Sequence, residues 1–161
     1  SLHFTRELLA ELEQAGIYLV HVTLHVGHGT FRPVRTRDIR EHRLGHEEYG
    51  IEPGAAQSIT QAKKEGRRIV AVGTTVVRTL ESVVGAKGEV KSGTGKTDLF
   101  ITPGFPFRVV DALITNFHLP RSSLLFLVSA FAGPDLIRTA YGRAIEKAYR
   151  FYSYGDAMLI L

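Results

Sequence analysis

The stretch TDLFITPGFPFRVVDALITNFHLPRSSLLFLVSAFAG, residues 97–133, decides how this chain folds and where its site lies. Its apolar segments predict strands near residues 98–101 and 109–114 and a helix over residues 122–132. Four polar side chains interrupt the apolar run, namely Thr115, Asn116, His118 and Arg121. An unpaired polar group buried there costs roughly 1–3 kcal/mol, so the four must bond to one another or to a ligand. The stretch therefore indicates a strand-to-helix unit that carries a binding site.

Strands and helices alternate along the rest of the chain. The residue patterns predict further strands over residues 17–25, 68–73 and 156–161, the first of them buried. They predict helices over residues 5–15, 53–66, 74–84 and 134–151, with the first helix packed against a sheet. Residues 85–96 are rich in Gly and Lys and predict a mobile surface loop. This alternation indicates an α/β fold, a mostly parallel sheet flanked by helices on both faces.

The expected sheet also predicts where a ligand would bind. In parallel sheets, ligands lie beyond the carboxyl ends of the strands. This rule selects the loops at residues 27–34, 73–75 and 115–122, which all follow predicted strands. Glycines and small polar residues collect in the same three loops, so two independent criteria agree.

Composition limits the class of protein. With 161 residues and 44% hydrophobic residues, the chain is expected to form a single α/β domain over residues 1–161. The absence of cysteine excludes disulfides and thiolate zinc sites and fits a cytoplasmic location. The longest apolar run, residues 124–132, is far shorter than the roughly 20 residues that span a bilayer, so no membrane segment is expected.

Positive charge gathers in two places, within a net charge of +4. Five arginines follow the first predicted strand, namely Arg32, Arg35, Arg37, Arg40 and Arg43. Four basic residues close the second predicted helix, namely Lys63, Lys64, Arg67 and Arg68. Such clusters contact phosphates when they are exposed, but interleaved acidic residues make an ordinary solvated face an equally good interpretation.

Two patterns that suggest a metal or a nucleotide fail on geometry. His21 and His25 lie four residues apart on one predicted strand, which separates them by roughly 13 Å and prevents both from binding one ion. The segment KSGTGKT, residues 91–97, lacks the first glycine of a phosphate-binding loop, because Val90 stands in that position. Neither a metal site nor nucleotide hydrolysis is expected.

Four segments together resemble the S-adenosylmethionine:tRNA ribosyltransferase-isomerase family of queuosine biosynthesis. They are VTLHVGHGTFRPV (residues 22–34), VGTTVVRTLE (72–81), the opening stretch (97–133) and AYGRAIEKAYRFYSYGDAMLI (140–160). They occur in the family's order, and the opening LHFT is also similar. LGHEEYG, residues 44–50, matches only loosely, and Val76 stands where the family usually has Ser. These departures weaken any role for His46 or Val76.

The resemblance implies a fold and an activity. Family members are about twice as long, with an α/β domain interrupted by an inserted β-barrel, so the chain is expected to be a fragment that lacks the barrel. The family transfers and isomerises the ribosyl moiety of S-adenosylmethionine onto 7-aminomethyl-7-deazaguanine at the tRNA wobble position, giving epoxyqueuosine, adenine and methionine. S-adenosylmethionine and tRNA are the implied partners, with no other cofactor, no metal and no membrane. We expect a monomer whose activity needs the missing barrel domain. The alternative is a noncatalytic RNA-binding or assembly module that retains the fold.

That chemistry needs a base near C5′ of the ribose, because the sulfonium acidifies those protons, and a donor that helps adenine depart. His118, His25 and Asp98 are the catalytic candidates, with His118 favoured because imidazole carries protons near neutral pH. His118 could instead tie a loop together before Pro120, and Asp98 could cap a turn. Asp111 is expected to be structural.

Twelve residues are predicted to bind substrate. Gly73, Thr74 and Thr75 open a helix whose backbone N–H groups suit a carboxylate, although a tight turn with a threonine cap is an equal alternative. The others are Gly27, Gly29, Thr30, Phe31, Arg78, Thr115, Asn116, Arg121 and Tyr154. They offer close backbone approach, hydroxyl and amide groups, positive charge and aromatic stacking.

Overall fold

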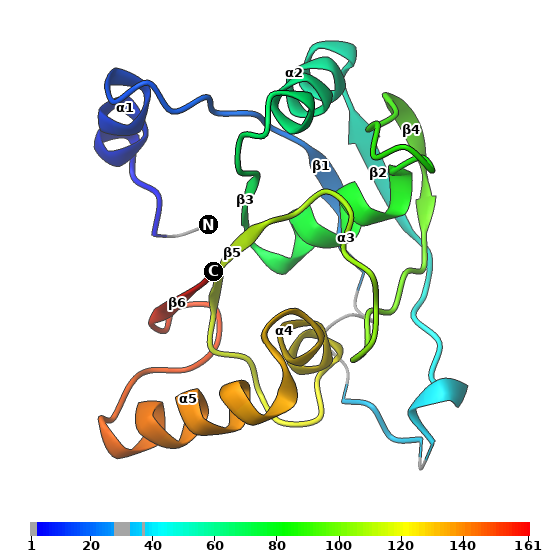
Figure 1. Cartoon of the computed structure of the whole chain (residues 1–161). Helices are drawn as coiled ribbons and strands as arrows, with labels where there is room; N and C mark the ends of the chain where they lie inside the picture. The colour runs from blue at the N-terminus through cyan, green and yellow to red at the C-terminus, as the bar shows by residue number, and fades with distance from the viewer. Residues whose placement is uncertain (1–2, 28–32, 37) are drawn as a thin grey trace.

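Two small three-stranded sheets organise the chain, joined by a central helix (Figure 1). The computed structural model describes residues 3–27, 33–36 and 38–161. The helices are α1 (Arg6–Gln14), η2 (Ile39–Glu41, a short 3-10 helix), α2 (Pro53–Lys64), α3 (Thr74–Val83), α4 (Ser123–Ala132) and α5 (Pro134–Glu146). The strands are β1 (Thr23–His25), β2 (Glu47–Ile51), β3 (Val70–Val72), β4 (Gly93–Thr97), β5 (Ala112–Asn116) and β6 (Ala157–Ile160).

The α/β class is confirmed, but the sheets are less parallel than predicted. One sheet has the order β1-β2-β4 with both pairs antiparallel. The other has the order β3-β5-β6, in which β3 and β5 run parallel and β6 returns antiparallel to β5. Among the described strands, β3 and β5 thus form the one parallel pair, and they do so because α3 crosses over between them.

The glycine-rich segment predicted as a mobile loop contains strand β4, and residues 98–101 are not a strand. Gly95 of β4 lies opposite Tyr49 of β2. A Cβ at Gly95 would collide with the Tyr49 ring, so the glycine leaves the space that this ring occupies. Glycine therefore allows the Tyr49 ring to pack against the β4 backbone, although a glycine usually weakens a strand.

The N-terminal predictions are partly wrong. Helix α1 forms with Thr5 as its cap, but it buries no residue and stands apart from the sheets in Figure 1. The predicted buried strand at residues 17–25 shrinks to Thr23–His25, and Ile17 and Tyr18 are exposed. A strand needs a paired neighbour, and no described segment pairs with residues 17–22.

Helix α3 lies at the centre of the fold and contacts strands of both sheets. Its apolar face places Val77, Leu80 and Val83 in the main hydrophobic core. Its ten residues include buried polar side chains as well, among them Arg78 and Glu81. Helix α3 thus packs between the two sheets and connects them through its contacts with both.

The C-terminal helices form as predicted, with α5 ending earlier, at Glu146. Within the described ranges, no helix by itself is long and apolar enough to cross a membrane, and α4 and α5, which pass that test as a pair, are bent by 115°.

Candidate functional site

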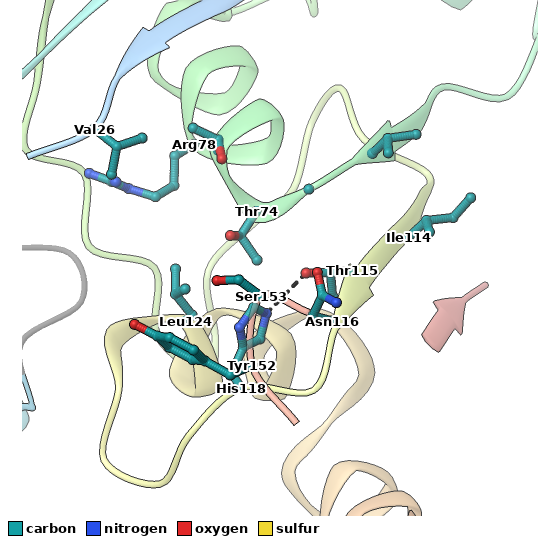
Figure 2. Close-up of a pocket in the computed structure, with 13 residues that line it drawn as sticks. Val26, Thr74, Arg78, Ile114, Thr115, Asn116, His118, Leu124, Tyr152 and Ser153 are labelled. Atoms are coloured by element: carbon teal, nitrogen blue, oxygen red, sulfur yellow. Dashed lines mark hydrogen bonds between the residues drawn. The ribbon is translucent and has the colours of Figure 1, made fainter. Parts of the chain in front are cut away.

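A cavity of about 210 Å³ lies at the carboxyl ends of β3 and β5 (Figure 2). The residues that line it are Val26, Val72, Gly73, Thr74, Thr75, Arg78, Ile114, Thr115, Asn116, His118, Leu124, Tyr152 and Ser153. The loop at 73–75 and the segment at 115–118, which lie far apart in the sequence, therefore share one cavity. This is where the sequence rule for parallel strands places a ligand.

Gly73 forms the sharp turn between β3 and α3 at the wall of the cavity. Its φ of 100° is a conformation that favours glycine, and its N–H donates to the Ile114 carbonyl at 2.8 Å. Helix α3 begins at the next residue, and its N-cap makes no side-chain hydrogen bond. The alternative of a threonine cap is thus wrong, because Gly73 occupies the cap position. The positive end of the α3 dipole, with Thr74 and Thr75, faces the cavity and suits an anionic group.

His118 and Thr115 bond to each other inside the protein. His118 Nε2 lies 3.0 Å from Thr115 Oγ1, and the His118 backbone N–H donates to the Tyr141 hydroxyl at 2.8 Å. Both residues are buried. Burial lowers the pKa of His118 to about 4, so its imidazole is neutral near pH 7. A neutral imidazole held by a hydroxyl can accept or relay a proton at the cavity wall.

This burial predicts a loss of stability in acid. Unfolded His118 titrates near 6.5 and folded His118 near 4, so between these values the unfolded state binds the extra proton and stability falls as the pH falls. We expect His118 to account for a loss of about 2 kcal/mol between about pH 7 and about pH 5, and of about 3 kcal/mol once the transition is complete.

Urea unfolding of the parent and of His118→Gln at these pH values measures that loss. The variant should lose less stability on acidification than the parent. Equal slopes in the two proteins would show that His118 is not the residue that titrates.

The Asn116 amide is engaged in structure. Its Nδ2 donates to the Gly155 carbonyl at 3.2 Å and lies 2.9 Å from His3 Nε2. These contacts tie the end of β5 to the segment that enters β6. Asn116 lines the cavity, but its amide nitrogen is bonded to the protein in the manner of a loop cap.

Arg78 forms a buried ion pair with Glu47 of β2. Arg78 Nε also donates to the Leu99 carbonyl at 3.1 Å, and Glu47 Oε1 accepts from the Gly27 N–H at 2.8 Å. Arg78, predicted to bind substrate, does line the cavity, but the carboxylate that its charge meets belongs to the protein. Sequence reasoning missed Glu47. Its signal was the alternation of Glu47, Tyr49 and Ile51, which marks a strand with one buried face.

Several predicted site residues lie away from the cavity. His25 is exposed on β1, opposite Glu48 of β2, in the β1-β2-β4 sheet. Gly27 bonds to Glu47 and does not line the cavity. Asp98 follows β4, and its side chain is 61% exposed. His25, Gly27 and Asp98 thus do not line this cavity, although Val26, which follows β1, does.

Two further residues predicted to bind substrate, Arg121 and Tyr154, also lie outside the cavity. Arg121 is exposed and lines a separate hollow with Pro33 and Val34. Tyr154 is 84% exposed and does not line the cavity, whereas Tyr152 and Ser153, which the prediction omitted, do. The predicted residues Gly29, Thr30 and Phe31 lie outside the described residues.

Asp111 has the structural role expected of it. Its carboxylate accepts from the Ile69 N–H and from Lys63 Nζ, each at 2.8 Å. Within the described part of the chain, no group of three or more histidine, aspartate or glutamate side chains is arranged to hold a metal ion.

Comparison with known proteins gives consistent matches. A family model described as "Queuosine biosynthesis protein" matches residues 1–160. The chain is 58% identical over 160 residues to the S-adenosylmethionine:tRNA ribosyltransferase-isomerase of Carboxydothermus hydrogenoformans and 58% identical to that of Moorella thermoacetica, covering 99% of this chain and 47% of each relative. A crystal structure of the S-adenosylmethionine tRNA ribosyltransferase from Thermotoga maritima aligns with a TM-score of 0.81 at 46% identity, covering 99% of this chain and 50% of that one. The chain spans about half the length of the curated relatives it matches.

Proposed function

The chain belongs to the family of queuosine biosynthesis proteins, and we propose that it forms the S-adenosylmethionine-binding part of a tRNA ribosyltransferase-isomerase. In this proposal the ribosyl moiety of S-adenosylmethionine is transferred and isomerised onto 7-aminomethyl-7-deazaguanine at the tRNA wobble position. The products are epoxyqueuosine in tRNA, adenine and methionine. The observation that carries the proposal is the cavity that joins the α3 N-terminus to the Thr115 and His118 pair.

The α3 end of the cavity suits the methionine carboxylate. The backbone N–H groups of Thr74 and Thr75 and the helix dipole favour a negative charge at this point. Tyr152 lines the same cavity, and an aromatic ring attracts a cation such as the sulfonium. The cavity volume of about 210 Å³ is below the roughly 300 Å³ at which small-molecule sites begin, so it would hold only part of the nucleoside.

His118 is the residue to which we assign proton transfer. Its low pKa keeps the ring deprotonated near neutral pH but makes it a weak base, so the acidity that the sulfonium gives the C5′ protons must drive the transfer. The Thr115 hydroxyl holds Nε2 and thereby orients the ring. We assign to Asn116 the shaping of the cavity, because its amide bonds to the chain.

The remaining partners follow from the same proposal. No metal or further cofactor is required by this chemistry, and a tRNA substrate places the protein in the cytoplasm. Because the chain spans about half the length of its relatives, we propose that these 161 residues alone turn over little or no substrate as a monomer.

Calorimetric titration with S-adenosylmethionine tests the proposal in the full natural polypeptide that contains these residues. We expect saturable heat from the parent and about tenfold weaker binding for His118→Ala and Thr115→Val, which is about 1.4 kcal/mol. His21→Ala, at an exposed position outside the cavity, should bind as the parent does. Normal binding and turnover in both cavity variants would show that the site is elsewhere, and RNA binding without S-adenosylmethionine binding would favour the noncatalytic alternative.

A further inference from the structure

The turn between α5 and β6 is held in one conformation by hydrogen bonds at both ends. Tyr152 has a φ of 72°, which is uncommon outside glycine, and its N–H donates to the Phe117 carbonyl at 2.8 Å. The Gly155 N–H donates to the Tyr152 carbonyl at 2.9 Å. Arg150 N–H donates to Asp156 Oδ2 at 2.7 Å, and Asp156 N–H donates to the Arg150 carbonyl at 2.8 Å. Surrounding contacts therefore fix a backbone that tyrosine alone would rarely adopt.

This fixed turn sorts its aromatic rings into an inner and an outer set. Phe151 points inward, with its ring centroid 5.4 Å from that of Phe117 and 5.7 Å from that of Tyr141. Tyr152 remains 46% exposed and Tyr154 84% exposed. Half-buried Phe151 thus packs on the rings of Phe117 and Tyr141, whereas the two tyrosines are more exposed.

Of the two outer tyrosines, Tyr152 lies at the proposed active site, and Tyr154 follows it two residues along the chain. Tyr152 and Ser153 line the cavity, and Figure 2 shows them next to His118. Two basic residues belong to the same segment. Lys147 is exposed, and the Arg150 side chain is 76% exposed and lies 3.5 Å from the Asp156 carboxylate. Exposed rings and basic groups on a segment that borders a cavity are features with which proteins hold single-stranded nucleic acid.

We propose that residues 147–156 form the surface on which the single-stranded loop of the tRNA rests. Tyr154 stacks on a base that neighbours the target base, and Tyr152 flanks the target base where it enters the cavity. Lys147 and Arg150 contact the adjacent phosphates. This inference rests on the proposed function, because the wobble base lies in an unpaired loop whose bases can stack on aromatic side chains.

Fluorescence anisotropy with a labelled anticodon stem-loop RNA tests the surface in the full natural polypeptide. Tyr154→Ala should bind the RNA about tenfold more weakly, the effect of losing a single stacked base. Tyr154→Phe, which keeps the ring, should bind as the parent does. Tyr18→Ala is the matched control, because Tyr18 is 77% exposed and lies on the segment that follows α1. Lys147→Ala should reduce the slope of log affinity against log salt by about one.

Three results would overturn the inference. They are absence of RNA binding by the parent, unchanged RNA affinity in Tyr154→Ala, and an equal loss in Tyr18→Ala. If that unchanged affinity comes with a lower melting temperature of Tyr154→Ala, the ring packs against protein. Calorimetry with S-adenosylmethionine separates the two proposals, since Tyr154→Ala should keep the parent's affinity for that ligand. A parent that binds the RNA through Tyr154 but gives no heat with S-adenosylmethionine would reject the proposed function alone.

Discussion

Glu81→Ala is expected to lower the free energy of unfolding by about 3–5 kcal/mol. The Glu81 carboxylate is buried on α3 and accepts three backbone hydrogen bonds, from Arg108, Val109 and Val110, each at 3.0 Å. Alanine would leave these donors without their acceptor, and each unsatisfied buried group costs about 1–3 kcal/mol. Small domains have roughly 5–15 kcal/mol of stability in total, so the variant should be near the limit of folding.

Urea unfolding followed by circular dichroism measures this effect, with two further variants as comparisons. Glu81→Gln keeps one acceptor oxygen and should lose about half as much stability. Glu146→Ala on α5 removes an exposed carboxylate, with 66% of its side chain accessible, and should change stability by less than about 0.5 kcal/mol. If Glu81→Ala were as stable as Glu146→Ala, the carboxylate would not be what holds residues 108–110 in place.

The order of the elements could be predicted from sequence wherever local pattern and tertiary environment agree. Residues 53–66 and 122–132 have apolar periodicity and end signals, and they form α2 and α4 close to the predicted limits. Pairing direction could not be predicted in this way, because it depends on which strands meet in space. Gly95 illustrates this limit, since its value lies in the room it leaves for a ring on another strand.

The candidate site, too, was predicted correctly at some residues and not at others. Gly73 follows β3, Thr115 lies at the carboxyl end of β5 and His118 follows that strand, so the rule for the ends of parallel strands located all three. Asp98 follows a strand of the antiparallel sheet and lies elsewhere, because the rule applies only to strands that share one edge. Tyr152 enters the site through an unusual backbone conformation, which no periodic pattern in the sequence signals.

The Arg78 and Glu47 ion pair joins helix α3 to the β1-β2-β4 sheet at the wall of the cavity. Arg78 comes from α3 and lines the cavity, while Glu47 comes from β2 and also binds the Gly27 backbone. Both side chains are almost fully buried, at 3% and 2% exposed. A buried ion pair adds little net stability relative to apolar residues, but the loss of one partner leaves a buried charge that the remaining contacts cannot offset.

Glu47→Ala is therefore expected to destabilise the chain by about 3–5 kcal/mol, while a double replacement restores much of that loss. Glu47→Leu combined with Arg78→Met removes both charges and fills the space with apolar atoms, so its loss should be smaller than the sum of the two single losses. Urea unfolding of the parent, Glu47→Leu, Arg78→Met and the double variant gives the coupling energy. Calorimetry with S-adenosylmethionine on the same proteins shows whether the pair also shapes the cavity, because the double variant should then remain folded yet bind more weakly. Strictly additive losses in the two single variants would mean that the two side chains stabilise the sheets independently of each other.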